Sequence, residues 1–502
     1  MEGTFIPWVL NFRKYLLEKY PLPGGQDPIP DNAKLPPKWL LSAKEPSEEE
    51  QPKTEEATQT GTELNGHGEP STYLGLHRLD HDVRPLADTL TATLTQNKRM
   101  TPAKHWQDVR HISLTVPETL PYGPGDMIAI TPKNFDSDVQ QLIDMMGWQE
   151  QADQLVSLVP GEGLAELDEL PPPPILGLDT YPRLTLRAFI MDYLDLRAIP
   201  RRAFFSAIAH YSTDETHVER LLEFIIPELL DEFWDYTTRP RRSILEILHE
   251  FHSVKVPWQH AVTVFPIFRV RQFSIASGGA LKHLPDGRTQ FDLLVAIVRY
   301  QTVIKRLREG VCTRYLAVLR PGSTLRVQLQ RGGLNSSVSQ LVGSTVLVGP
   351  GTGIAPLRSI IWEKAGLVQA YKARHPGVEP PMGPTILLYG GRSRNADFFF
   401  EDEWQSLQDL VQLRVYTAFS RDQRHKVYVQ DVVRENKSLF YDLLHNRNGS
   451  VYICGSSGSM PKAVREALVE TFEHGPGEFD RKVAEEYLQG MEKTGRYKQE
   501  TW

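Results

Sequence analysis

After about residue 340 the sequence repeats one pattern, and this pattern constrains the fold most. Four short apolar runs, TVLVG, TILLYGG, QLRVYTAFS and VYICGSS, have the length of buried strands, and stretches of helical character separate them. Strands that alternate with helices in this way are typical of a parallel sheet with helices on both faces. We therefore predict a doubly wound α/β domain over residues 339–502.

A glycine-rich turn joins the first of these strands to the next helix, in the sequence TVLVGPGTGIAPLRS. Gly351, Thr352 and Gly353 lie in this turn, where glycine lets the backbone approach a phosphate and the N–H groups of the helix start can bind it. The spacing differs from G-x-G-x-x-G, so it does not indicate an ordinary NAD site. The alternative is a turn that serves the fold alone.

A cationic loop follows the third apolar run, in the sequence AFSRDQRHKVYVQ. Ser420, Arg421 and Lys426 offer a hydroxyl and two cations, and Tyr428 adds a flat ring. This combination suits an adenosine 2′-phosphate, because Arg and Lys pair with the dianion and Tyr can stack on adenine. Two charged hydrogen bonds would favour NADPH over NADH by roughly 10²–10⁴. The alternative is a solvated loop without a ligand.

A second domain is indicated upstream, over residues 76–338. Strand-like alternation lies on both sides of a helical block at about 137–255. Residues 263–276, 291–300 and 323–330 are predicted strands on the far side of that block. The pattern predicts an antiparallel β-domain interrupted by a helical insertion.

Two motifs in this second domain offer groups that suit a dinucleotide. In RQFSIAS, Arg271 provides a cationic fork for a pyrophosphate, Phe273 a ring face and Ser274 a hydroxyl. In GVCTRYL, residues 310–313 lie at a predicted helix start and can supply backbone N–H groups to phosphate. The alternative is an arginine that pairs at the surface and binds no ligand.

The first 75 residues differ from both domains in composition and in hydrophobic pattern. Residues 4–20 have the spacing of an amphipathic helix, which Pro21 and Pro23 end. Residues 44–70 are rich in acids and almost free of apolar residues, which is typical of disorder. We therefore predict a separate helix over 1–20 and a disordered, acidic and proline-rich linker over 21–75.

The composition excludes several classes of protein. The net charge is -7, with no long basic run, so we expect no nucleic-acid partner. The two cysteines exclude a disulfide framework, and neither they nor the histidines have metal-site spacing, so we predict no metal. No apolar stretch has the length of a membrane span and no secretory signal precedes the chain's first helix, so we expect no membrane partner. The expected compartment is the cytoplasm, with mitochondria as a second one.

Taken in order, these motifs resemble the ferredoxin–NADP reductase superfamily. The order is R-x-[YF]-S-x-x-S, G-V-C-T, G-P-G-T-G-I-A-P, Y-G-x-R, S-R-x(4)-K-V-Y-V-Q and C-G. The helical insertion is similar to that of the diflavin reductases. The start FIPWVLNFRKYLLEKYPLP and the end RYKQETW resemble the diflavin oxidoreductases of cytosolic iron–sulfur assembly.

The resemblance implies a fold and a set of cofactors. It implies an antiparallel FAD-binding β-barrel with a helical insertion, followed by a doubly wound, parallel-sheet NADP-binding domain. In the family a flavodoxin-like FMN domain precedes the barrel, and residues 1–20 look like its last helix. FAD and NADPH are therefore the expected cofactors, and FMN is expected only where that N-terminal domain exists.

The resemblance also implies site residues. Contacts to FAD are implied for Arg241, Arg271, Gln272, Phe273, Ser274, Gly310, Val311, Cys312, Thr313 and Trp502. Contacts to NADPH are implied for Gly351, Thr352, Gly353, Ser420, Arg421, Lys426, Val427, Tyr428, Val429 and Gln430. The residues implied around the reacting atoms are Ser274, Cys454, Glu500 and Trp502, the last stacked on the flavin and moving aside for nicotinamide. Many relatives carry tyrosine in place of Phe273.

The implied activity is hydride transfer from NADPH to FAD. In the family, electrons then pass through FMN to an iron–sulfur protein of the anamorsin type, which is the expected partner in iron–sulfur cluster assembly. Two alternatives stay open at this point. One is a reductase that serves a haem monooxygenase or sulfite reductase, and the other is a non-catalytic scaffold that binds an iron–sulfur partner.

Overall fold

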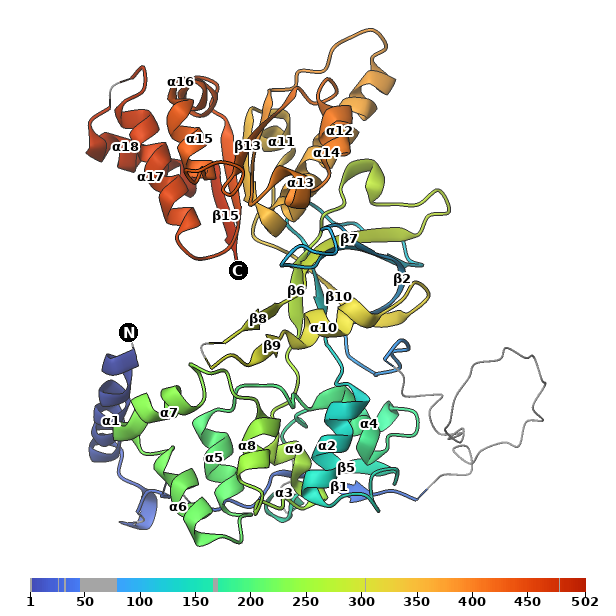
Figure 1. The fold of residues 1–502 in the computed structure, drawn as a ribbon, viewed down its shortest axis with the longest axis vertical. Coiled ribbons are helices and arrows are strands. Elements are labelled where there is room, and N and C mark those ends of the chain that lie inside the picture. The colour runs from blue at the N-terminus through green and yellow to red at the C-terminus, as the bar shows by residue number, and fades with distance from the viewer. Residues whose placement is uncertain are drawn as a thin grey trace, which may run out of the picture.

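The computed structural model describes residues 2–25, 27–30, 33–45, 79–165, 170–302, 304–477 and 479–502. Figure 1 shows three lobes in a row: a helical lobe at the bottom, a barrel in the middle and a sheet flanked by helices at the top. The first helix, α1 (Glu2–Lys19), lies beside the helical lobe near α7 (Leu230–Tyr236). It ends before Pro21, as the sequence predicts.

The upper lobe is a five-stranded parallel sheet. Its strands, in the spatial order β13-β12-β11-β14-β15, are Leu413–Phe419, Thr385–Gly391, Thr345–Pro350, Ser450–Gly455 and Tyr497–Thr501. From β11 the chain runs outward to β12 and β13, and then returns to the other side of β11 for β14 and β15. The strand order therefore reverses between β11 and β14, and ligands of such sheets bind at this switch point.

Helices cover both faces of this sheet, which confirms the predicted doubly wound fold. Leu347 packs into a core with α12 (Ile354–Arg374) and α14 (Glu401–Leu407). Its neighbours Val346 and Val348 point to the other face. The helices on that face are α15 (Val429–Glu435), α16 (Lys437–Tyr441), α17 (Met460–Glu473) and α18 (Arg481–Lys493). Two short helices, α11 (Val338–Val342) and α13 (Arg394–Asp397), flank the sheet.

The middle lobe is the predicted antiparallel barrel. Its strands, in the order β6-β4-β10-β2-β3-β7, are Arg271–Ser274, Met127–Ile130, Thr324–Gln330, Leu90–Arg99, Val109–Val116 and Thr289–Ala296. A bridge between Ile275 and Leu293 joins the two outer strands and closes the barrel. Helix α10 (Val311–Val318) packs Tyr315 and Leu316 into the barrel core. A two-stranded ribbon, β8 (Arg299–Gln301) and β9 (Leu307–Glu309), precedes this helix.

The helical lobe is inserted between β4 and β6, as predicted. It contains α2 (Asp136–Met146), α3 (Glu162–Ala165), α4 (Leu186–Tyr193), α5 (Arg202–Ala209), α6 (Glu215–Glu223), α7, α8 (Ile244–Glu250) and α9 (Ala261–Val264). Part of the predicted strand over 263–276 is wrong, because residues 263–264 belong to α9 and only 271–274 form a strand. Pro266 lies between the two and separates them.

The prediction of a disordered linker over 21–75 is wrong for one segment. Residues Trp39–Ala43 form β1, which pairs antiparallel with β5 (Val156–Pro160) of the helical lobe. Leu41 is buried there among the helices. The partner strand lies far along the chain, so local composition could not reveal the pairing. Residues 46–78, which hold most of the predicted linker, lie outside the described residues.

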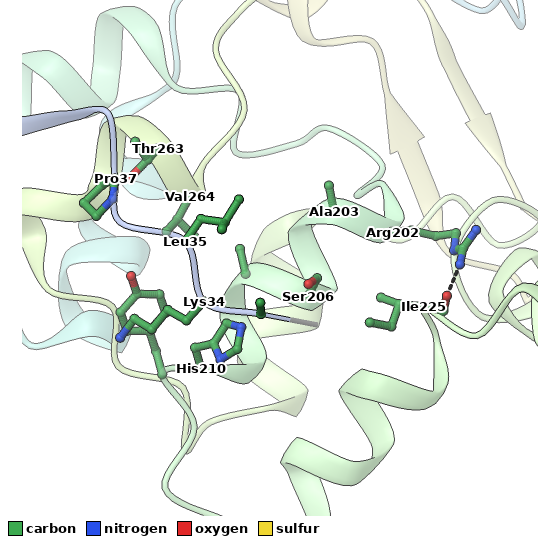
Figure 2. A pocket seen from close by; sticks show the side chains of 13 residues that line it. Lys34, Leu35, Pro37, Arg202, Ala203, Ser206, His210, Ile225, Thr263 and Val264 are labelled. Atoms are coloured by element: carbon green, nitrogen blue, oxygen red, sulfur yellow. Dashed lines mark hydrogen bonds between the residues drawn. The ribbon is translucent and has the colours of Figure 1, made fainter. Parts of the chain in front are cut away.

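Residues 33–37 cross the helical lobe before β1. Together with α5 and α9 they line a pocket of about 500 Å³. Figure 2 shows Leu35 of this segment beside Val264, and Arg202 at the far end donating to the Ile225 carbonyl. The segment is thus packed along the lobe and leads directly into β1.

A buried ion cluster joins the helical lobe to the barrel. The Arg84 guanidinium donates to both carboxylate oxygens of Asp82, at 2.8 and 2.6 Å, and to the carbonyls of Pro132 and Asp192. Lys133 lies 3.2 Å from the Asp192 carboxylate. Two buried cations and two buried acids therefore balance one another, and the cluster holds the two lobes in one arrangement.

Candidate functional site

The barrel and the sheet meet at a hydrogen bond between two predicted site residues. Ser274 ends β6 of the barrel, and its hydroxyl donates to Glu500 Oε1 at 2.5 Å. Glu500 lies in β15, the last strand of the sheet. The two residues are 226 positions apart in the sequence, so only the docking of the two domains brings them together.

Cys454 lies directly beside this pair. It is the last residue but one of β14 and is the register partner of Glu500 in β15. Its side chain is fully buried. Burial, with the nearby Glu500 charge as a second cause, raises the pKa of the thiol well above its ordinary value. Cys454 is therefore a neutral, protonated thiol.

The glycine loop reaches the same point. A Cβ atom on Gly353 would lie 2.2 Å from the Cys454 carbonyl oxygen, and one on Gly349 would lie 2.6 Å from a methyl of Leu357. Gly351 has a φ of 57°, which favours glycine. Gly353 is thus required for the loop to pack against β14, Gly349 for its approach to α12, and Gly351 for the turn itself. No side chain caps the start of α12. The Ile354 N–H that opens α12 donates to the carbonyls of Gly351 and Thr352, so what the helix start offers a ligand is the positive end of its dipole.

Glu500 is the titratable group of the cluster. Burial raises the pKa of its carboxyl, the Ser274 hydrogen bond lowers it, and the charge of Asp126 raises it again. The second oxygen, Oε2, is buried and has no hydrogen-bond partner among the described residues. A carboxyl in this position can hold a proton and accept one further hydrogen bond.

Trp502 follows β15 and is tied to the sheet through its backbone. Its N–H donates to the Gly455 carbonyl at 3.1 Å, and its carbonyl accepts from the Ser457 N–H at 3.0 Å. The ring itself is 52% exposed. The anchor lies next to Cys454, so the ring can move without loss of the strand.

A second group of predicted residues surrounds the start of α10. A Cβ atom on Gly310 would lie 2.8 Å from both the Thr313 hydroxyl and the Val298 side chain, so glycine is required there. No side chain caps this helix start. Burial raises the pKa of the Cys312 thiol to about 12, and the charge of Arg271 lowers it, which places Arg271 close to the helix start. Cys312 packs in the barrel core, so it can offer a ligand only its backbone.

Arg241 lines a cationic pocket beside this helix start. The pocket has a volume of about 550 Å³, and it also contains Arg197, Arg242, Arg306 and Arg308, together with three glutamates. It reaches Glu309, the residue before Gly310. Arg306 and Arg308 were not predicted from the sequence, although the basic run KRLRE directly precedes the G-V-C-T motif. A pocket of this charge fits the phosphate end of a dinucleotide.

The third group lies at the outer edge of the sheet. The N–H groups of Ser420 and Arg421 donate to the carbonyls of Gly391 and Arg392, at 3.0 and 2.8 Å. These bonds join the loops after β12 and β13. Arg421 and Lys426 are exposed, and within the described part of the chain neither has a carboxylate within 4 Å. Tyr428 is 43% exposed beside them. Unpaired cations beside an exposed ring fit the predicted 2′-phosphate site.

Four predicted contact residues have side chains that serve the fold. Val429 is buried in the core below α15, and Val427 packs against that core. Gln272 donates to Gln330 across the barrel surface at 2.7 Å. Phe273 packs partly against the barrel core. The valines can therefore contribute only backbone groups to a ligand, and alternate residues such as Tyr428 face the solvent instead.

One residue that holds the two domains together was not singled out from the sequence. Arg358 of α12 is nearly fully buried and donates to Glu403 at 2.7 and 2.8 Å. It also donates to Asp292 of β7 and to the Ala276 carbonyl, each at 3.0 Å. Its guanidinium thus connects the sheet domain with the barrel. The sequence shows only an arginine on a helix, and the carboxylates that pair with it are far along the chain.

Comparison with protein families gives two matches. Residues 85–315 match the FAD binding domain, and residues 347–466 match the oxidoreductase NAD-binding domain. These ranges contain the predicted FAD residues from Arg241 to Thr313, the predicted NADPH residues from Gly351 to Gln430, and Cys454, whereas Glu500 and Trp502 lie outside them. The uncapped helix starts, the glycines that admit no Cβ and the unpaired cations fit both cofactors.

The chain is also similar to several curated proteins, all with the name NADPH-dependent diflavin oxidoreductase 1. The protein of Aspergillus fumigatus is 68% identical over 507 residues, which cover 100% of this chain and 77% of that protein. The protein of Emericella nidulans is 64% identical over 508 residues, covering 100% of this chain and 76% of that protein. The protein of Danio rerio is 32% identical over 508 residues, covering 100% and 77%.

Proposed function

Because this chain belongs to the NADPH-dependent diflavin oxidoreductase family, we propose that it delivers electrons from NADPH through FAD, and onward through FMN, to an anamorsin-type iron–sulfur protein. The chain is an oxidoreductase with FAD- and NAD-binding domains. The onward route, the iron–sulfur partner and a role in cytosolic iron–sulfur cluster assembly are the proposed part. The observation that carries the reductase half is the junction of Ser274, Glu500 and Cys454 between the two domains.

The protein's contribution to the reaction is alignment and proton control. When bound, FAD supplies the chemistry, because its isoalloxazine ring accepts a hydride from nicotinamide. The Ser274 hydroxyl donates a hydrogen bond to the Glu500 carboxyl at 2.5 Å. Burial keeps the pKa of Glu500 raised, so its carboxyl can supply and recover a proton at neutral pH more readily than an exposed one.

Cys454 and Trp502 control access to this junction. Cys454 is buried and neutral, so it fills space at the strand end and excludes water without adding charge. The Trp502 ring is exposed on a backbone anchored at Gly455. We expect the ring to cover the flavin in the resting state and to swing aside when nicotinamide enters.

The proposed electron transfer from FAD through FMN to an iron–sulfur protein is supported by the family to which the chain belongs, and not by the residues at the junction of the two domains. The relatives' name specifies two flavins. We expect the purified chain to carry FAD, and FMN only together with a flavodoxin-like domain.

We place the protein in the cytoplasm, with mitochondria as the second compartment. Among the described helices none is long and apolar enough to span a membrane, and the described residues contain no group of three potential metal ligands.

The test offers the purified chain a series of electron acceptors. We expect it to reduce ferricyanide at least 100-fold more efficiently with NADPH than with NADH; equal efficiency would contradict the assignment of residues 420–428. A flavodoxin is then added as an FMN carrier, with an oxidised anamorsin-type protein as acceptor under argon. Bleaching of the cluster band that needs both NADPH and the flavodoxin would support the proposal. Reduction of cytochrome c or of a sulfite reductase haemoprotein, with an unchanged cluster, would overturn it.

A further inference from the structure

An exposed tryptophan of the barrel touches the sheet domain beside the 2′-phosphate site. Trp106 lies in the loop between β2 and β3. The guanidinium carbon of Arg392, in the loop after β12, lies 3.7 Å from the centre of the indole ring. The ring is nevertheless 56% exposed. A cation on a ring face at this distance is attracted by the ring's quadrupole, so the contact is a specific one.

The barrel loop that carries Trp106 is held rigidly. Arg99 donates to the carbonyls of Thr101 and Pro102, each at 3.1 Å. The Thr101 hydroxyl donates to the Gln107 carbonyl at 2.8 Å and accepts from the Val109 N–H at 3.2 Å. These bonds close the loop on both sides of Trp106. The indole ring is therefore presented in a fixed position, and little entropy is lost when Arg392 stacks on it.

Arg392 is a half-buried cation without an anion. No carboxylate lies within 4 Å of its guanidinium in the described part of the chain. The nearest acid, Asp397, accepts instead from the backbone N–H groups of Arg392 and Ser393, at 2.9 Å each. Burial and the like charge of Arg421 lower the pKa of Arg392, and the charge of Asp397 opposes them only in part. Two neighbouring guanidiniums without an ion-paired carboxylate favour a bound dianion.

The loops that carry these two arginines are tied together. The Arg421 N–H donates to the Arg392 carbonyl, and the Arg394 N–H donates to Asp422 at 2.8 Å. Arg392 is thus part of the same cluster as Ser420 and Arg421. The indole ring adds a contact to the Arg392 guanidinium from the barrel.

We propose that Trp106 is a positioning residue for the 2′-phosphate of NADPH, and that it acts by holding the Arg392 guanidinium beside Arg421. Because Trp106 belongs to the barrel and Arg392 to the sheet domain, tight binding of the phosphate requires both domains to be docked. The substrate is therefore bound best in the arrangement that also joins Ser274 to Glu500. This inference concerns NADPH binding and does not depend on the proposed electron acceptor.

The test compares the variants W106A, W106F, R392M and W106A/R392M in the FAD-loaded chain. The probes are 2′,5′-ADP and 5′-AMP, and their affinities are measured by titration calorimetry without turnover. We expect W106A to weaken 2′,5′-ADP three- to tenfold and to leave 5′-AMP within twofold. W106F keeps a ring face and should stay within about twofold of the wild type. The double variant should be no weaker than R392M, because Trp106 acts through Arg392.

Kinetics and a control complete the test. In W106A the KM for NADPH should rise three- to tenfold while kcat with ferricyanide stays within twofold. The control W8A removes an equally exposed tryptophan, 57% exposed, from α1, and should change neither affinity. Equal weakening of 2′,5′-ADP and 5′-AMP would show that the ring stacks on adenine and would overturn the proposal. Unchanged 2′,5′-ADP affinity in W106A, or additive losses in the double variant, would overturn it as well.

Discussion

Replacement of Arg358 by methionine tests how strongly the two domains are held together. Arg358 makes four hydrogen bonds, three of them to the carboxylates of Asp292 and Glu403. Methionine has a similar length but donates none of them. Removal of one partner from a buried ion pair typically costs about 3–5 kcal/mol, because the remaining charge stays buried without compensation. We expect a loss of this size.

The state of Asp292 supports this magnitude. Burial alone would raise the pKa of its carboxyl, but His111, Arg358 and Ser113 bring the pKa down to about 2. Relative to the ordinary value of 3.8, this difference corresponds to about 2 kcal/mol. Glu403 adds a second, partly exposed charge, which is better screened. His111 and Ser113 stay in place in R358M, so Arg358 accounts for only part of this difference, and the lost pairing with Glu403 adds to it.

The loss should depend on pH in a defined direction. Since the folded-state pKa of Asp292 lies below its unfolded value, its pairing contributes stability above about pH 4 and loses it as pH falls toward 2. Without Arg358 the pKa of Asp292 rises, so the carboxyl takes up a proton at higher pH. The deficit of R358M should therefore be complete at pH 7 and smaller at pH 3, inside the range between the folded and unfolded pKa values.

The assay is urea unfolding at both pH values, followed by tryptophan fluorescence. Trp362, one of nine tryptophans, donates to Glu403 at 2.9 Å, so part of the fluorescence signal comes from this contact. R358K keeps the positive charge but loses the planar set of guanidinium N–H donors, so we expect it to lose less unfolding free energy than R358M. R374M is the matched control, because Arg374 is exposed in the last turn of the same helix. An R358M midpoint equal to that of R374M, or a deficit that does not change with pH, would refute the reasoning.

Three further predictions concern other buried groups. We expect neither Cys312 nor Cys454 to react with Ellman's reagent in the folded chain at pH 8, because both are buried and burial raises the pKa of both thiols; two thiols should react in urea, and a fast-reacting thiol before unfolding would contradict this. Burial lowers the pKa of Lys364 to about 7. The buried charge therefore reduces the free energy of unfolding fully below pH 7, and this reduction vanishes toward pH 10.5. The stability of the wild type relative to K364M, measured by urea midpoints, should therefore rise between pH 7 and pH 10, and a constant difference would exclude a shifted lysine. E500Q keeps the shape of the side chain but cannot hold an acidic proton, so we expect flavin reduction by NADPH in stopped flow to slow by about 10²-fold; an unchanged rate would remove Glu500 from proton transfer.

The architecture of both domains could be predicted from the sequence, because it rests on local signals. The apolar runs around Leu347 and Leu387 have the length of buried strands and end in glycine turns, as a parallel sheet requires. The start of α10 at Val311 and the loop at Gly351–Gly353 follow from residues that are adjacent in the chain. Strand β2 was not predicted, because its sequence LTATLTQNKR buries few apolar residues.

What connects the domains was decided by the tertiary structure alone. The sequence names Ser274, Glu500 and Arg358 as types of residue, yet it contains nothing about their distances. Ser274 meets Glu500, and Arg358 meets Asp292, only after a barrel and a sheet have folded separately and docked. The same holds for Trp106 and Arg392, which belong to loops of different domains. Hydrophobic periodicity and turn residues are signals that act over a few neighbouring residues. Contacts between distant segments depend on how whole surfaces pack, and no single position of the sequence specifies them.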